Sequence, residues 1–274
     1  DYHTFLYYKI PGILAFGFAM FFLYLFFSKR FSLIKSAFFT ALFALNPFFI
    51  NFTNYIFTDL PYLLWCIVSI LCMERYYSSK TVPQRVTFAV LTGITVFLAN
   101  FTRAAGMSLL ATMLLIDLFN LISLIFRRSN APLRIVNQTR ISRRLVRLLP
   151  YAVYGVLLLV SYSVVPYYAN TTSISRYSSA SVFAQNFVYY ASILFDQFPM
   201  SVSPYEIFHF SVYWIVVPLF LLGIARSAKR EKIVLVYFSI TYLAMHFVNA
   251  LNGIRYAFPI LFVFLLFLAY GADF

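Results

Sequence analysis

Three charged side chains stand next to long apolar segments, where they could act on an anionic ligand. Asp59 lies in the stretch NYIFTDLPYLL, Arg103 lies in NFTRAAGMS, and Arg255 precedes Tyr256 in NALNGIRYAFPI. Charges within or beside membrane-spanning segments are costly, so each of these residues is a candidate functional group. The planar guanidinium of arginine is well shaped to hold a phosphate. The carboxylate and the two arginines therefore predict a site for a polyanion.

Each of these residues also has a structural interpretation that the sequence leaves open. Asp59 is placed to cap the helix that Leu60 and Pro61 begin. Arg103 could cap the carbonyl groups that end the preceding helix, and Arg255 could extend to the membrane interface. None of these roles excludes binding or catalysis.

The other polar residues within apolar segments are weaker candidates for a functional site. Asp117 lies inside an apolar segment, where it could pair with a neighbouring helix or relay protons, and His246 lies inside another, where a hydrogen-bonded core histidine is favoured over a ligand. Cys66 and Cys72 are six residues apart, roughly on opposite sides of a helix, and predict neither a disulfide nor a metal site. The motifs HExxH, GxSxG, DxD and the P-loop are absent from the sequence, so no metal ligand is assigned.

The composition requires lipid as the solvent for much of the chain. Hydrophobic residues make up 62% of the 274 residues, charged residues make up 11%, and the mean hydropathy is +0.83. A soluble domain is about 45–50% apolar and about 25% charged. We therefore predict an all-α, polytopic bundle of about nine membrane spans, near 11–28, 36–52, 60–73, 87–102, 105–126, 148–168, 208–225, 233–250 and 257–272.

The basic residues predict which loops lie in the cytoplasm. When the loops are assigned alternately to the two sides, 17 of the 21 Lys and Arg residues fall on one side, in the loops 29–35, 74–86, 127–147 and 226–232. The positive-inside rule places this side in the cytoplasm. The net charge of +13 is therefore a topology signal, and nucleic acid is not expected as a partner.

The same pattern places Asp59, Arg103 and Arg255 together on the external face. We expect a single transmembrane domain over 1–274, with a long, partly helical external segment at about 169–207. The sequence begins at Asp1 without a signal sequence, and we expect at least one further span and its external loop upstream.

Two stretches carry a resemblance to a known family. ALNPFFINFTNYIFTDLPYLLWCIVSILCMERYY and LTGITVFLANFTRAAGMSLLATMLLIDLF resemble polytopic glycosyltransferases of the GT-C type, and most of all the family 39-like enzymes, which are relatives of the protein O-mannosyltransferases and of lipid A aminoarabinose transferase. The late NGIRYAFPILFVFLLFLAYG resembles the Arg-Tyr-x-x-Pro segment of that family. The matching positions are Asn46, Pro47, Thr58, Asp59, Gly93, Thr102, Arg103, Arg255, Tyr256 and Pro259.

The resemblance implies a hexosyltransferase or mannosyltransferase-like activity on the external face. Such enzymes move a sugar from a polyprenyl-phosphate donor to a lipid, glycan or protein acceptor. It implies that Asp59, Arg103, Arg255 and Tyr256 bind substrate, and that the base is an acid of the first external loop, which precedes the matched region. The catalytic residue is therefore unassigned, and the need for a divalent metal stays open. A bacterial inner membrane is the expected location, with the endoplasmic reticulum membrane as the alternative.

Two other functions remain as alternatives. A multi-span transporter or lipid flippase would use intramembrane groups such as Asp117 and His246 as relays. A membrane scaffold without catalytic function would tolerate changes at all of these residues. The transferase hypothesis instead requires the charged groups on the external side.

Overall fold

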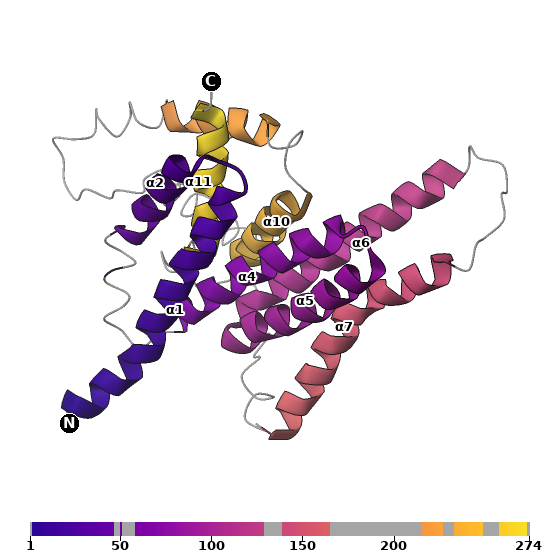
Figure 1. The fold of residues 1–274 in the computed structure, drawn as a ribbon, viewed down its shortest axis with the longest axis horizontal. Helices are drawn as coiled ribbons and strands as arrows, with labels where there is room; N and C mark the ends of the chain where they lie inside the picture. The colour runs from indigo at the N-terminus through magenta and orange to yellow at the C-terminus, as the bar shows by residue number, and fades with distance from the viewer. Residues whose placement is uncertain are drawn as a thin grey trace.

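Every regular element that the computed structural model describes is a helix (Figure 1). The described residues are 2–46, 50, 58–128, 139–164, 215–226, 233–248 and 258–272. The elements are α1 (Tyr2–Ser28), α2 (Leu33–Ala44), α4 (Asp59–Ser78), α5 (Val82–Thr102), the 3-10 helix η1 (Ala104–Gly106), α6 (Met107–Arg128), α7 (Thr139–Val164), α10 (Ile233–Val248) and α11 (Phe258–Ala272), with a further helix at Ile215–Arg226.

The fold is the predicted polytopic bundle of transmembrane helices. Each of the nine predicted spans overlaps a helix of the described residues. Long apolar helices able to cross a bilayer lie at Lys9–Ser28, Val82–Thr102, Ala104–Ser123 and Val146–Val164. The helices Leu33–Ala44, Ile215–Arg226, Val234–His246 and Pro259–Ala272 are apolar but shorter.

Length separates these two groups of helices. The 12 residues of α2 rise only about 18 Å along a helix axis, whereas a bilayer core is about 30 Å thick. The sequence therefore predicts the existence of these elements better than their extent. Apolar side chains are exposed along α1, as lipid contact requires, and include Ile13, Leu14, Phe18 and Phe21.

Helix α4 lies in the middle of the bundle, and most of its residues are buried (Figure 1). It packs against α1 on one side and α5 on the other, and α7 packs on the far side of α5 (Figure 1). Its buried residues continue from Asp59 to Tyr76. A helix that is buried on most of its surface is surrounded by protein instead of lipid, which explains how α4 carries charged residues at both of its ends.

Aromatic side chains join the N-terminal helices to the C-terminal one. The ring of Phe26 in α1 meets the ring of Phe262 in α11 edge-on, with 5.3 Å between centroids. Phe31, just after α1, lies 5.4 Å from the ring of Tyr270 in α11. The first pair is edge-to-face and the second is tilted by 46°, and aromatic pairs of both kinds add to the packing energy of the apolar core.

Glycine allows α5 and α7 to approach closely. A Cβ atom at Gly93 of α5 would lie 2.6 Å from the carbonyl oxygen of Pro150 and 2.8 Å from Cβ of Val153, both in α7. Small residues at such contacts are a common device of membrane helix packing. Gly155 of α7 differs, because a Cβ added there would have no neighbour within 4 Å.

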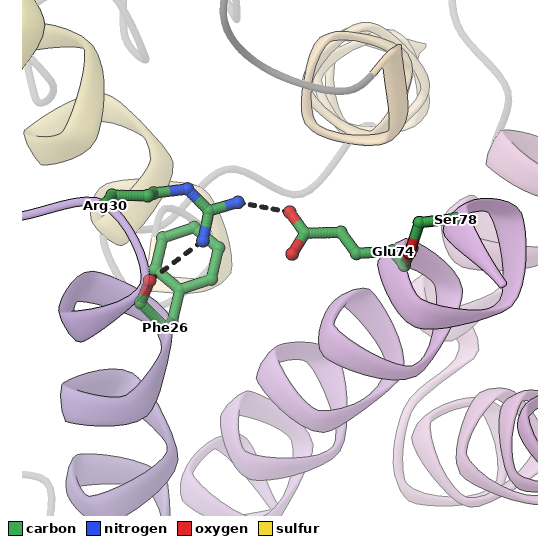
Figure 2. A network of polar contacts seen from close by, with 4 residues as sticks. All are labelled: Phe26, Arg30, Glu74 and Ser78. Atoms are coloured by element: carbon green, nitrogen blue, oxygen red, sulfur yellow. Dashed lines mark hydrogen bonds and ion pairs between the residues drawn. The ribbon is translucent and has the colours of Figure 1, made fainter. Parts of the chain in front are cut away.

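Interhelical polar contacts connect loop ends that the sequence places on the same side. Arg30, after α1, forms an ion pair with Glu74 near the end of α4, and its guanidinium lies over the ring of Phe26 (Figure 2). Arg30 also donates a 2.8 Å hydrogen bond to the carbonyl of Phe26. Arg226 donates to the carbonyl of Tyr270 at 3.2 Å. These contacts agree with helices that cross alternately in opposite directions.

Candidate functional site

Asp59 begins the central helix α4 and is buried. The preceding residue, Thr58, occupies the N-cap position without a side-chain capping bond, and its carbonyl accepts a 2.9 Å hydrogen bond from the backbone N–H of Tyr62. Asp59 is thus the first helical residue and not the cap itself, which corrects the capping interpretation. A carboxylate in the first turn is favoured by the positive end of the helix dipole.

Arg103 follows the last residue of α5 and extends its side chain to α4. Its backbone is extended, with φ −152° and ψ 141°, and its N–H donates a 3.0 Å hydrogen bond to the carbonyl of Ala99. The guanidinium forms an ion pair with the carboxylate of Asp59, and the two side chains are only 16% and 4% exposed. The structure therefore brings together two of the four predicted substrate-binding residues.

A tight turn holds Arg103 in this position. The 3-10 helix η1 follows at once, and the N–H of Gly106 donates to the carbonyl of Arg103 at 2.9 Å. A Cβ at Gly106 would overlap the backbone of Ala99 and Asn100, so this close approach requires glycine. The sequence NFTRAAGMS thus predicts the turn correctly, and Gly106 is the residue that permits it.

His246 lies in the last turn of α10 and is buried. Its Nδ1 is 2.9 Å from the carbonyl oxygen of Tyr242, and its ring stacks on the ring of Tyr242 with 4.3 Å between centroids. The guanidinium of Arg103 is close enough for its charge to act on the buried imidazole. His246 is thus the hydrogen-bonded, buried histidine that the sequence analysis favoured over a ligand.

Buried polar contacts that the sequence analysis missed hold the surrounding helices together. Thr112 of α6 and Thr241 of α10 share a hydrogen bond of 2.8 Å between their hydroxyl groups. Thr241 also donates to the carbonyl of Ser108 at 3.0 Å. The amide of Asn100 in α5 donates to the hydroxyl of Tyr154 in α7 at 2.8 Å. Isolated Thr, Asn and Tyr residues in apolar helices gave no pattern from which these pairs could be derived.

The remaining predicted residues are either elsewhere or outside the described part of the chain. Arg255 and Tyr256 lie outside it, as does the external segment 169–207. Asp117 lies towards the other end of the bundle, where its carboxylate accepts a 2.8 Å hydrogen bond from the hydroxyl of Tyr151. Within the described residues, no group of three or more His, Cys, Asp or Glu side chains is arranged to hold a metal ion.

Comparison with known proteins gives a likeness of fold. No protein-family model and no curated protein matches the sequence. The crystal structure of ArnT from Cupriavidus metallidurans in the apo state is similar, with a TM-score of 0.52 over 97% of this chain and 16% sequence identity. This chain has an ArnT-like fold. It covers 44% of the length of that ArnT chain.

Proposed function

We propose that this chain acts as a membrane glycosyltransferase of the GT-C type, which moves a sugar from a polyprenyl-phosphate donor to an acceptor on the external face. The observation that carries the proposal is the buried ion pair between Asp59 and Arg103. It lies where helices α4 and α5 meet on the predicted external side. The ArnT-like fold is consistent with the same class of enzyme that the sequence resembles.

The proposed chemistry creates negative charge where Arg103 lies. In sugar transfer, the bond between the anomeric carbon and a phosphate oxygen breaks, and the acceptor oxygen forms the new bond to that carbon. The departing lipid phosphate gains negative charge, which a positioned guanidinium stabilises. Asp59 orients that guanidinium from a rigid helix end, so Asp59 is a positioning residue and not the base. The base belongs to the first external loop that the resemblance implies.

His246 and the predicted external turn 251–256 complete the proposed site. The imidazole lies close enough to Arg103 for the charge of the guanidinium to act on it. It is buried and stacks on the ring of Tyr242 in α10. Arg255 and Tyr256 are proposed to bind the same substrate from the predicted external turn 251–256. A donor whose tail lies in the bilayer explains why the enzyme is embedded there as well.

The transporter alternative has less support from the arrangement. A relay from Asp117 to His246 would need these groups close together in the membrane. His246 lies near Arg103, which contacts Asp59, the first residue of α4. Asp117 shares a cavity with Tyr77, which lies at the other end of α4. Along a helix these positions are about 27 Å apart.

The test is a transfer assay on the full-length gene product purified in detergent. Wild type, Arg103→Ala and Asp59→Asn are supplied with radiolabelled polyprenyl-phosphate sugars and membrane lipid acceptors. The matched control is Arg30→Ala, which breaks an interhelical ion pair at the opposite end of α4. Transfer by wild type and the control, with loss of transfer per folded molecule in both site variants, supports the proposal. Folded wild-type protein that consumes no donor from a panel of sugars contradicts it.

A further inference from the structure

A polar cavity lies at the opposite end of α4 from the Asp59–Arg103 pair. Its volume is about 220 Å³, and the side chains that line it come from α4, α5, α6 and α7: Tyr76, Tyr77, Arg85, Asp117, Asn120 and Arg147. The loops next to it, 74–86 and 127–147, are among the basic loops that the sequence places in the cytoplasm. The proposed glycosyltransferase chemistry makes no use of this cavity.

Hydrogen bonds fix several of the groups that surround the cavity. The hydroxyl of Tyr151 donates to Asp117 at 2.8 Å, and Arg85 donates to the carbonyl of Ser79 at 2.9 Å. The hydroxyl of Tyr77 donates to the carbonyl of Met113 at 3.4 Å. The cavity is therefore held by contacts between α4, α6 and α7 and by one bond to the short connection between α4 and α5.

The charges of the cavity are of both signs and lie apart from each other. The charge of Arg147 acts on Asp117, yet in the described part of the chain the ion pairs join neither Arg147 nor Arg85 to Asp117. Two guanidinium groups match a phosphate, and a carboxylate matches an ammonium group. A ligand with one phosphate and one primary ammonium would satisfy both signs at once.

We propose that this cavity binds the headgroup of an aminophospholipid from the cytoplasmic leaflet. The phosphate lies against Arg85 and Arg147, and the ammonium group donates to the carboxylate of Asp117. Basic pockets between transmembrane helices on the cytoplasmic side are suited to lipid headgroups. The cavity lies where α5 and the apolar part of α7 (Val146–Val164) begin and α4 ends, which is the depth of headgroups in a helix bundle of this orientation. Free inorganic phosphate would bring no cationic group to the carboxylate of Asp117.

The test measures binding of soluble, short-chain lipids to the full-length protein in detergent. Dihexanoyl phosphatidylethanolamine, phosphatidylcholine and phosphatidylglycerol are compared by native mass spectrometry, together with inorganic phosphate. In wild type, phosphatidylethanolamine is expected to bind about tenfold more tightly than phosphatidylcholine, because a quaternary ammonium cannot donate a hydrogen bond to Asp117. This comparison needs no variant and so is independent of folding.

Two variants test separately the contacts proposed for the ammonium group and for the phosphate of the headgroup. Asp117→Asn is expected to lower affinity for phosphatidylethanolamine about tenfold without lowering affinity for phosphatidylglycerol, and Arg147→Gln is expected to lower both. Arg75→Gln is the control, because Arg75 is exposed near the end of α4 and lies outside the cavity. Equal binding of phosphatidylethanolamine and phosphatidylcholine overturns the proposal. So does displacement of the lipid by millimolar phosphate, which would make free phosphate the ligand.

Discussion

The guanidinium of Arg103 forms an ion pair with the carboxylate of Asp59, which ties the turn after α5 to the first residue of α4. Both side chains are largely shielded, and the tight turn through Gly106 leaves the backbone of Arg103 little freedom. A positive group held this firmly meets what the proposed stabilisation of the departing phosphate requires. Substitutions at this ion pair are therefore expected to affect transfer activity and stability in separable ways.

Arg103→Lys is expected to separate these two roles. Lysine keeps the positive charge and can still pair with Asp59, so the melting temperature should change little. A single ammonium lacks the fork that holds a phosphate by two parallel hydrogen bonds, so sugar transfer should fall by about tenfold to a hundredfold. The initial transfer rate and thermal unfolding of the same preparation measure this. Full activity in Arg103→Lys would show that only the charge matters.

Arg103→Ala is expected to destabilise the bundle through the carboxylate that it leaves behind. Removal of one partner of a buried ion pair costs about 3–5 kcal/mol, and Asp59 is buried. The double variant Arg103→Ala with Asp59→Asn should recover part of that loss, because no unpaired charge remains. Unfolding by chemical denaturant in micelles provides the comparison. A double variant less stable than Arg103→Ala would contradict the ion-pair interpretation.

At the other end of α4, Glu74→Gln is expected to affect stability alone. Glu74 is buried and pairs with Arg30, which also lies over Phe26 at 4.0 Å (Figure 2). The neutral amide keeps the shape but weakens a charge-assisted contact, so we expect a loss of about 1–3 kcal/mol in unfolding free energy. Transfer activity per folded molecule should equal that of wild type. A selective loss of transfer would place this end of the bundle in the catalytic cycle.

The sequence predicts the helices well because each is an apolar run between polar loops. It predicts their ends less well, as α4 illustrates. The predicted span 60–73 ends before Glu74 because a carboxylate is costly in a membrane, but the helix continues to Ser78. The partner that neutralises Glu74 is Arg30, which belongs to a different predicted loop. Only the packing of α1 against α4 reveals that the pair exists.

Part of the candidate site could be predicted from local sequence, and part depends on contacts between helices far apart in the sequence. Asp59 and Arg103 are recognisable because both stand at abrupt changes from apolar to polar sequence, and the alternation of loops places them on one face. The approach of His246 to Arg103 depends on how α10 packs against α6, through Thr112 and Thr241. Hydroxyl pairs of this kind follow no repeat in the sequence, so the position of α10 could not be predicted.

Two glycines of the helix pair α5 and α7 are expected to respond differently to the same substitution. Gly93→Ala would place a methyl group 2.6 Å from the carbonyl oxygen of Pro150, and the helices must separate to admit it. Such overpacking typically costs about 1–3 kcal/mol. Gly155→Ala adds the same methyl where nothing lies within 4 Å, and alanine favours a helix over glycine by about 0.5–1 kcal/mol. Thermal unfolding in detergent should therefore show a lower melting temperature for the first variant and an equal or higher one for the second.

Since Asn100 also joins α5 to α7 through Tyr154, the Gly93 variant should disturb the external end of α5 and lower transfer as well. An unchanged melting temperature in Gly93→Ala would mean that α5 and α7 are not in close contact.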